Sequence, residues 1–256
     1  MTIWEHLEEL RWTLIKILGI FMVATGVGLF YVNQILEILI APLNSLLIKS
    51  EVMLDQPGAL SSMMLKPGVI LNQAGPFDGV IIKMKVGILA GIIVSLPLVI
   101  IFLWSFIAPG LKKKERDAFW WIFSSINILF MIGVIAGYYA LHIVMPILVS
   151  FGVEGAQNFW RIREYIDFVF FWLLGAGLIF ELPLVIVILV RIGLVKLEAL
   201  RKMRKYAFVL SFVVSAIITP TPDAVSQIIV AIPMYLLYEL GIFASSFQKR
   251  KNDDII

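Results

Sequence analysis

The stretch IDFVFFWLLGAGLIFELPLVIVILV at residues 166–190 decides the fold class of this chain. It exceeds the roughly 20 predominantly apolar residues that a helix needs to cross the hydrocarbon core of a bilayer. Its middle carries one carboxylate, Glu181, and Pro183 follows two residues later. The stretch therefore predicts a transmembrane helix with an ionisable group deep inside it.

The composition extends this interpretation to the whole chain. Of the 256 residues, 61% are hydrophobic and 15% are charged, against about half and about 25% in soluble proteins. One globular core cannot bury so much apolar surface, so lipid is the natural solvent for it. The sequence has no cysteine, which excludes disulfides, thiolate nucleophiles and Cys-ligated metals.

Hydropathy predicts an all-α membrane protein with six transmembrane helices in one polytopic domain, residues 1–256. The last two apolar runs, 206–219 and 225–238, have 14 residues each. At about 1.5 Å per residue each helix would span only about 21 Å, whereas the hydrocarbon core of a bilayer is about 30 Å thick. Either the bilayer thins there or flanking side chains snorkel; the alternative is one re-entrant hairpin. The predicted spans are 14–32, 86–107, 118–141, 166–190, 206–219 and 225–238.

The distribution of positive charge orients these spans. Three acidic residues, Glu5, Glu8 and Glu9, precede the first one, which is unlike the basic start of a cleaved signal peptide. With the N-terminus inside, fifteen of the 21 Lys and Arg residues lie on the cytoplasmic side. The positive-inside rule then places both termini in the cytoplasm. We expect the outer loops 33–77 and 142–165 to form a cap together, and the first to include an amphipathic helix near 34–47.

Polar and proline residues inside the spans are the candidate functional positions. An ionisable group at a helix centre costs about 2.5–3.5 kcal/mol on insertion scales. Glu181 beside Pro183 therefore indicates a polar groove, or a protonated carboxyl bonded to a neighbouring helix. Pro97 and Pro233 are expected to kink their helices, although transmembrane helices also tolerate proline without a functional reason.

Two cytoplasmic carboxylates, Glu9 and Glu115, lie at the inner membrane interface. Paired carboxylates there could bind an arginine-rich ligand through bidentate, charge-assisted hydrogen bonds. Solvated or internally paired charges are the plainer alternative.

No pattern of catalytic residues is present. His6 and His142 lie on opposite sides of the membrane in this topology, so they cannot share a metal or an active site. The sequence has no zinc-protease, nucleophile-elbow or phosphate-loop motif. We therefore predict no enzyme activity, no metal and no cofactor.

Several motifs in a fixed order resemble one family, TatC. HLEELR at 6–11 resembles its amphipathic start, and FIAPGL at 106–111 with Glu115 resembles its first cytoplasmic loop. FELP at 180–183 resembles its fourth span. TPTPDAVSQ at 219–227, AIPMY at 231–235 and YELG at 238–241 resemble its closing hairpin. The resemblance runs from about residue 5 to about residue 247.

The resemblance implies a subunit of the twin-arginine protein translocase in a bacterial inner membrane. Such proteins bind twin-arginine signal peptides of folded cargo and dock TatA- and TatB-type single-span partners, and the proton-motive force drives export. It also implies kinked helices forming a concave wall under the outer cap, and self-association in a larger complex within the lipid bilayer. No nucleic acid is implied as a partner.

The resemblance also implies roles for individual residues. Glu9 and Glu115 would receive the arginines of the signal peptide, with Arg11 and Phe106 in the same surface. Glu181 and Gln227 would meet a polar residue of a partner helix. The remaining positions would shape the closing hairpin and its helices: Pro220, Pro222, Asp223 and Glu239, with Pro97 and Pro233 as kinks.

One departure from the family pattern and two other functions remain. The loop before Glu115 reads KKK at 112–114, which adds positive charge beside a site for two arginines.

A proton-coupled small-solute transporter using Glu181 is the main alternative function, although we see neither a second buried charge nor an internal repeat. An intramembrane hydrolase is the third, and we find no nucleophile and base on one side.

Overall fold

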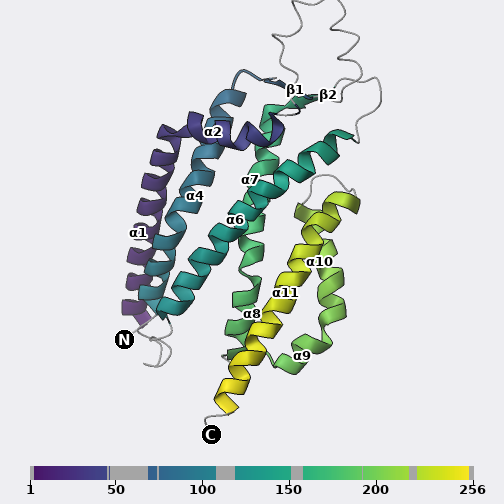
Figure 1. Cartoon of the computed structure of the whole chain (residues 1–256). Coiled ribbons are helices and arrows are strands. Elements are labelled where there is room, and N and C mark those ends of the chain that lie inside the picture. Colours follow the sequence, from purple (N-terminus) through teal and green to yellow (C-terminus); the bar gives the residue numbers. More distant parts are fainter. Residues whose placement is uncertain are drawn as a thin grey trace, which may run out of the picture. The chain divides into compact units, whose positions relative to one another are not determined.

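Helices account for nearly all of the described chain (Figure 1). The structure is a computed structural model that describes residues 3–44, 46, 69–73, 75–107, 119–150, 158–191, 193–218 and 224–253. Their order is α1 (Ile3–Phe30), α2 (Val32–Ile40), η1 (Ala41–Leu43), β1 (Val69–Asn72), α4 (Asp78–Ile107), α6 (Phe119–Ser150), β2 (Asn158–Arg161), α7 (Ile162–Phe180), α8 (Leu182–Arg191), α9 (Leu197–Lys202), α10 (Arg204–Ile218) and α11 (Ala224–Asp253).

Within these ranges, five helical segments are long and apolar enough to cross a membrane. The mostly helical membrane architecture predicted from hydropathy is therefore confirmed. Val32–Leu43 is a shorter apolar helix. Helix α10 has 15 residues, which corresponds to about 22 Å. The five segments are Leu7–Phe30, Asp78–Leu103, Phe123–Ser150, Ile162–Arg191 and Ser226–Ser246.

The last helix corrects one expectation from the sequence. We expected a short final span ending near residue 238, but the apolar part of α11 is 21 residues long and ends at Ser246. The prediction stopped at Glu239 because a carboxylate lowers local hydropathy. In the structure Arg204 donates a hydrogen bond to Glu239 at 2.8 Å, and the apolar residues resume at Leu240. Of the last two helices, α10 alone is short.

The described chain divides into two compact units; helices α1, α4, α6 and α7 each contribute to both, whereas α11 lies wholly in the first. Unit 1 comprises Met1–Ile20, Ser95–Gly137 and Phe171–Ile256, and unit 2 comprises Phe21–Val94 and Tyr138–Phe170.

Close approach of backbones forms the helix contacts of unit 1. A Cβ on Gly133 of α6 would lie 2.7 Å from the carbonyl oxygen of Ala176 in α7. One turn later, the carbonyl of Gly137 accepts a hydrogen bond of 2.9 Å from the indole of Trp172. Lipid provides no hydrophobic driving force for helices to associate, so their contacts depend on close packing. Small residues permit that close approach. Farther along the chain, α11 packs against both α8 and α10.

Unit 2 is built on the same kind of contact, with hydrogen bonds at one end. A Cβ on Gly28 of α1 would lie 2.8 Å from the carbonyl oxygen of Gly87 in α4. The hydroxyl of Tyr165 donates to the carbonyl of Leu39 in α2 at 2.6 Å. Strands β1 and β2 pair in parallel, with Val69 opposite Asn158. The amphipathic helix expected near 34–47 is present as α2 followed by η1.

Candidate functional site

Three of the residues that the resemblance predicts for signal-peptide binding lie on two neighbouring helices of unit 1. Glu9 and Arg11 are on α1, and Phe106 is in the last turn of α4. The ammonium of Lys16 on α1 lies 5.8 Å from the ring centre of Phe102 on α4, so these parts of the two helices are adjacent. They run in opposite directions (Figure 1).

This geometry brings Glu9 and Phe106 to the same end of the helix pair. Glu9 precedes Lys16 by about two helical turns, and Phe106 follows Phe102 by about one turn. Both side chains are half-buried, whereas Glu8 and Arg11 are exposed. A carboxylate beside an aromatic ring offers an ion pair and a stacking face to a guanidinium.

The fourth predicted member of this surface, Glu115, lies outside the described residues, as do Pro220, Pro222 and Asp223 of the closing hairpin. The two kink prolines are described: Pro97 is inside α4 and Pro233 is inside α11.

Glu181 occupies a break in the helical backbone, two residues before Pro183. Helix α7 ends at Phe180 and α8 begins at Leu182. The amide of Glu181 donates to the carbonyl of Leu178 at 3.1 Å, a tighter i−3 bond. Because Pro183 has no N–H, it cannot donate to the turn before it.

The carboxyl of Glu181 is incompletely satisfied within the described part of the chain. The residue is half-buried, but its Oε1 atom is fully enclosed and has no hydrogen-bond partner there. A buried acceptor without a donor costs about 1–3 kcal/mol. Such a cost marks a position that can gain from a donor supplied by another molecule.

Sequence reasoning missed a second incompletely satisfied group, Asn127 on α6. Its Nδ2 donates to the carbonyl of Phe123 at 2.8 Å, while its Oδ1 is enclosed without a partner among the described residues. One turn later, Phe130 packs against Gly177 of α7. Because α6 and α7 are antiparallel (Figure 1), Asn127 lies near the level of Glu181. An amide inside an apolar run was the available signal.

Gln227 and Glu181 lie at different levels of unit 1. Gly241 of α11 packs against Pro183, a Cβ on it falling 3.0 Å from the proline Cα atom. Gln227 precedes Gly241 by about 14 residues, or roughly 21 Å along the helix, whereas Glu181 precedes Pro183 by two. The carbonyl of Gln227 accepts a hydrogen bond of 2.7 Å from the hydroxyl of Ser215, which joins α10 to α11.

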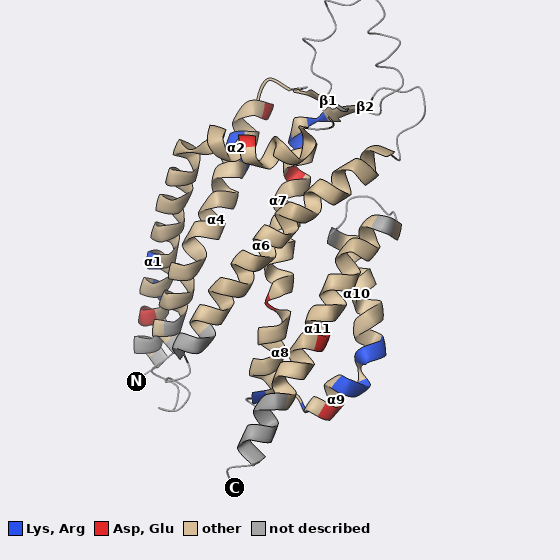
Figure 2. Ribbon diagram, viewed as in Figure 1, with Lys and Arg blue, Asp and Glu red and all other residues tan. Residues whose placement is uncertain are grey.

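Glu239 is part of a polar cluster between α10 and α11. Its carboxylate accepts hydrogen bonds from Arg204 at 2.8 Å and from the hydroxyl of Tyr235 at 3.0 Å. Basic residues gather along α9 and the start of α10 (Figure 2). Arg201, Arg204 and Glu239 line a pocket of about 750 Å³ together with apolar residues of α11.

Two ion pairs in unit 2 were also missed. Lys85 of α4 pairs with Asp167 of α7, and Arg163 of α7 pairs with Asp78 of α4 at 3.2 Å. Asp78 also accepts a bond of 2.8 Å from the amide of Gly75. The sequence showed these charges, but their partners are more than 80 positions away.

Comparison with known proteins gives a consistent result. Residues 5–233 match the model of the family described as Sec-independent protein translocase protein (TatC). The chain is 34% identical over 252 residues to the Sec-independent protein translocase protein TatC of Carboxydothermus hydrogenoformans, covering 98% of this chain and 95% of the relative. It is 33% identical over 246 residues to the TatC protein of Escherichia coli K12, covering 94% and 87%.

A solved structure is similar as well. The crystal structure of the twin-arginine translocase receptor TatC superposes with a TM-score of 0.73 at 31% identity, and covers 94% of this chain and 98% of that one.

Proposed function

Because this chain belongs to the TatC family of Sec-independent protein translocase subunits, we propose that it binds twin-arginine signal peptides of folded cargo and organises TatA- and TatB-type partners. Export is then driven by the proton-motive force across a bacterial inner membrane. The observation that carries the peptide-binding part is the adjacency of α1 and α4 through Lys16 and Phe102.

In this proposal the paired arginines of a signal peptide bind at the end of α1 and α4 that carries Glu9 and Phe106. Glu9 binds one guanidinium in a bidentate ion pair, because planar guanidinium and carboxylate groups match in geometry. Phe106 supplies an aromatic face for stacking. Glu115 is eight positions beyond the last residue of α4 in the sequence and binds the second arginine.

Partner docking uses the polar positions deeper in unit 1. The unpartnered oxygen of Glu181 accepts a hydrogen bond from a polar side chain of a partner helix. Gln227 lies about three turns of α11 from the level of Glu181, so it contacts a different part of the partner. Six spans with both termini in the cytoplasm complete the arrangement, α10 being the short span around which the bilayer thins.

The experiment that tests this function is photo-crosslinking in native membranes. A twin-arginine signal peptide with a photo-reactive residue beside its arginines is compared on wild-type protein and on Glu9→Gln and Glu115→Gln. The matched control is Glu8→Gln, which removes an exposed carboxylate one position away. Loss of one charged hydrogen-bond partner is worth about 1.5–3 kcal/mol, so we expect at least about a tenfold loss of crosslinking for either test variant.

Three results would contradict parts of this proposal. Absence of any crosslink to the wild-type protein would contradict peptide binding and turn attention to proton-coupled transport through Glu181. Equal losses with Glu8→Gln and Glu9→Gln would indicate diffuse electrostatic attraction. Full crosslinking of a twin-lysine peptide would show that bidentate recognition is not used.

A further inference from the structure

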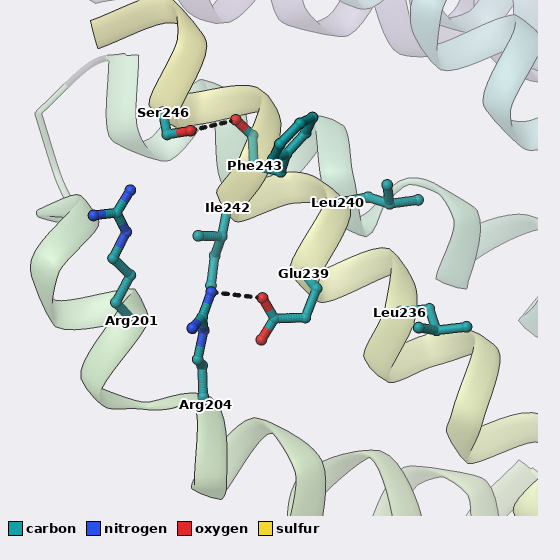
Figure 3. A pocket seen from close by; sticks show the side chains of 8 residues that line it. All are labelled: Arg201, Arg204, Leu236, Glu239, Leu240, Ile242, Phe243 and Ser246. Atoms are coloured by element: carbon teal, nitrogen blue, oxygen red, sulfur yellow. Dashed lines mark hydrogen bonds and ion pairs between the residues drawn. The ribbon is translucent and has the colours of Figure 1, made fainter. Parts of the chain in front are cut away.

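A pocket between α9, the start of α10 and the second half of α11 has no role in the proposed function (Figure 3). Its volume is about 750 Å³, within the range of about 300–1,000 Å³ that is typical of small-molecule sites. Two guanidinium groups, from Arg201 and Arg204, lie on one side of it (Figure 3). Leu236, Leu240 and Phe243 continue its lining along α11.

The two arginines are in different electrostatic states. Arg204 donates to Glu239 at 2.8 Å, and this ion pair holds it against α11. Arg201 is exposed and forms no ion pair with another described residue. Its guanidinium is therefore available to an anion at the mouth of the pocket.

Hydrogen bonds within the chain hold the pocket in shape. The hydroxyl of Tyr238 on α11 donates to the carbonyl of Leu200 at 2.8 Å, and Leu200 directly precedes Arg201. The hydroxyl of Tyr235 donates to Glu239 at 3.0 Å. The backbone that carries Arg201 is thus fixed to the helix that supplies the apolar lining.

A ligand for this pocket needs an anionic end and an apolar end. Leu236 is 55% exposed and Phe243 is 61% exposed, so the lining away from the arginines is open to apolar chains. A soluble anion would use the guanidinium groups and leave this surface uncovered. A basic signal peptide would be repelled by the surrounding cations, which outnumber the acidic residues on α9 and at the start of α10.

We propose that this pocket binds an anionic phospholipid, with the phosphate at Arg201 and Arg204 and an acyl chain along Leu236, Leu240 and Phe243. Basic side chains at the cytoplasmic surface attract anionic lipids, and a guanidinium binds phosphate oxygens in a bidentate manner. The site combines one exposed arginine that forms no ion pair with another described residue and an open apolar lining along α11. It does not depend on signal-peptide binding at α1 and α4.

Native mass spectrometry of the full chain in detergent tests the proposal. Delipidated protein is titrated with dioleoyl phosphatidylglycerol, and in parallel with dioleoyl phosphatidylcholine and inorganic phosphate. The test variant is Arg201→Gln. The matched control is Lys202→Gln, which removes the same charge from the next residue of α9, a residue that does not line the pocket.

We expect phosphatidylglycerol to bind better than phosphatidylcholine, and Arg201→Gln to weaken phosphatidylglycerol binding by about tenfold, the equivalent of one charged contact. Lys202→Gln should leave binding within about twofold of wild type. A second variant, Leu240→Gln, should weaken phosphatidylglycerol binding while leaving inorganic phosphate binding unchanged, because it alters the acyl part alone. Circular dichroism checks that each variant keeps its helix content.

Four results would overturn the proposal. Equal binding of the two lipids would remove the requirement for an anion. Equal losses in Arg201→Gln and Lys202→Gln would show diffuse attraction. Displacement of the lipid by equimolar inorganic phosphate would indicate a soluble-anion site. A photo-reactive amino acid at Phe243 that crosslinks in membranes to a single-span protein instead of lipid would make the pocket a protein-docking site.

Discussion

At the scale of single residues, the carboxyl of Glu181 is only partly satisfied by its surroundings. Its Oε1 is enclosed without a partner among the described residues, and it occupies the break between α7 and α8 that Pro183 imposes. Glu239, also inside an apolar helix, accepts bonds from Arg204 and Tyr235 instead. These two carboxylates therefore have opposite energetic effects on the isolated subunit.

Replacing Glu181 with leucine should stabilise the isolated protein while reducing export. Leucine removes the buried acceptor, which costs about 1–3 kcal/mol when unpaired, so the free energy of unfolding should rise by up to that amount. Export should fall because the proposed partner contact is lost. Unfolding by SDS titration in mixed micelles gives the first quantity, and transport of a twin-arginine cargo into vesicles gives the second.

Glu239→Leu is the control for this prediction. It leaves Arg204 unpaired and should lower stability, although by no more than about 1 kcal/mol, because both side chains are partly exposed to solvent and such pairs are screened. A loss of stability in Glu181→Leu as large as that in Glu239→Leu would show that the Glu181 carboxyl is satisfied in the folded subunit.

At the scale of helices, packing depends on glycines that allow two backbones to approach. Gly28 and Gly26 both lie in α1 and, two positions apart, face opposite sides of the helix. A Cβ on Gly28 would meet the carbonyl oxygen of Gly87 at 2.8 Å and the Cβ of Ala90 at 2.9 Å, whereas nothing lies within 4 Å of a Cβ on Gly26. One glycine is therefore a packing requirement and the other is not.

Gly28→Ala and Gly26→Ala should consequently change stability in opposite directions. The first forces α1 away from α4, and overpacking of this kind typically costs about 1–3 kcal/mol. The second replaces glycine by a better helix former in open space and should be neutral or stabilising by up to about 1 kcal/mol. Thermal unfolding in detergent, followed by circular dichroism, measures both. Equal tolerance of the two substitutions would show that α1 and α4 are not in close contact at Gly28.

At the scale of the whole molecule, the number of membrane crossings depends on α10. The described helices include five that satisfy the length and composition of a span, and α10, at about 22 Å, is shorter than the roughly 30 Å core of a typical bilayer. If α10 crosses, the chain has six spans and its termini share one side. If α10 does not cross, α11 starts on the side of the membrane where α9 lies. The chain then has five spans, and the C-terminus lies on the side opposite to the N-terminus.

Cysteine labelling distinguishes these topologies cleanly because the sequence has no cysteine. We expect a membrane-impermeant maleimide added outside spheroplasts to label Gln73→Cys and Ala224→Cys, and to label Glu198→Cys and Asn252→Cys only after lysis. Labelling of Asn252→Cys in intact spheroplasts would establish five spans. Failure to label Ala224→Cys from outside, with Asn252 inside, would favour the re-entrant hairpin.

The limits of prediction from sequence are visible in the helix ends. The second predicted span began at residue 86, but α4 begins at Asp78. The sixth predicted span ended at residue 238, but α11 continues past Glu239. Hydropathy treats Lys85 and Glu239 as polar interruptions. In the structure each is paired with a residue from another helix, Asp167 and Arg204 respectively, so the helices continue through them.

The sequence by itself determined the membrane class, most of the apolar segments and the family, because these depend on residues that are neighbours along the chain. Tertiary structure alone decided which polar groups are satisfied: Glu239 has a partner 35 positions away, while Glu181 and Asn127 each keep one oxygen without a partner among the described residues. It also separated Gln227 from Glu181 and formed the pocket beside Arg201. Hydrogen bonds and cavities depend on distances between segments remote in sequence, and residue type alone does not specify those distances.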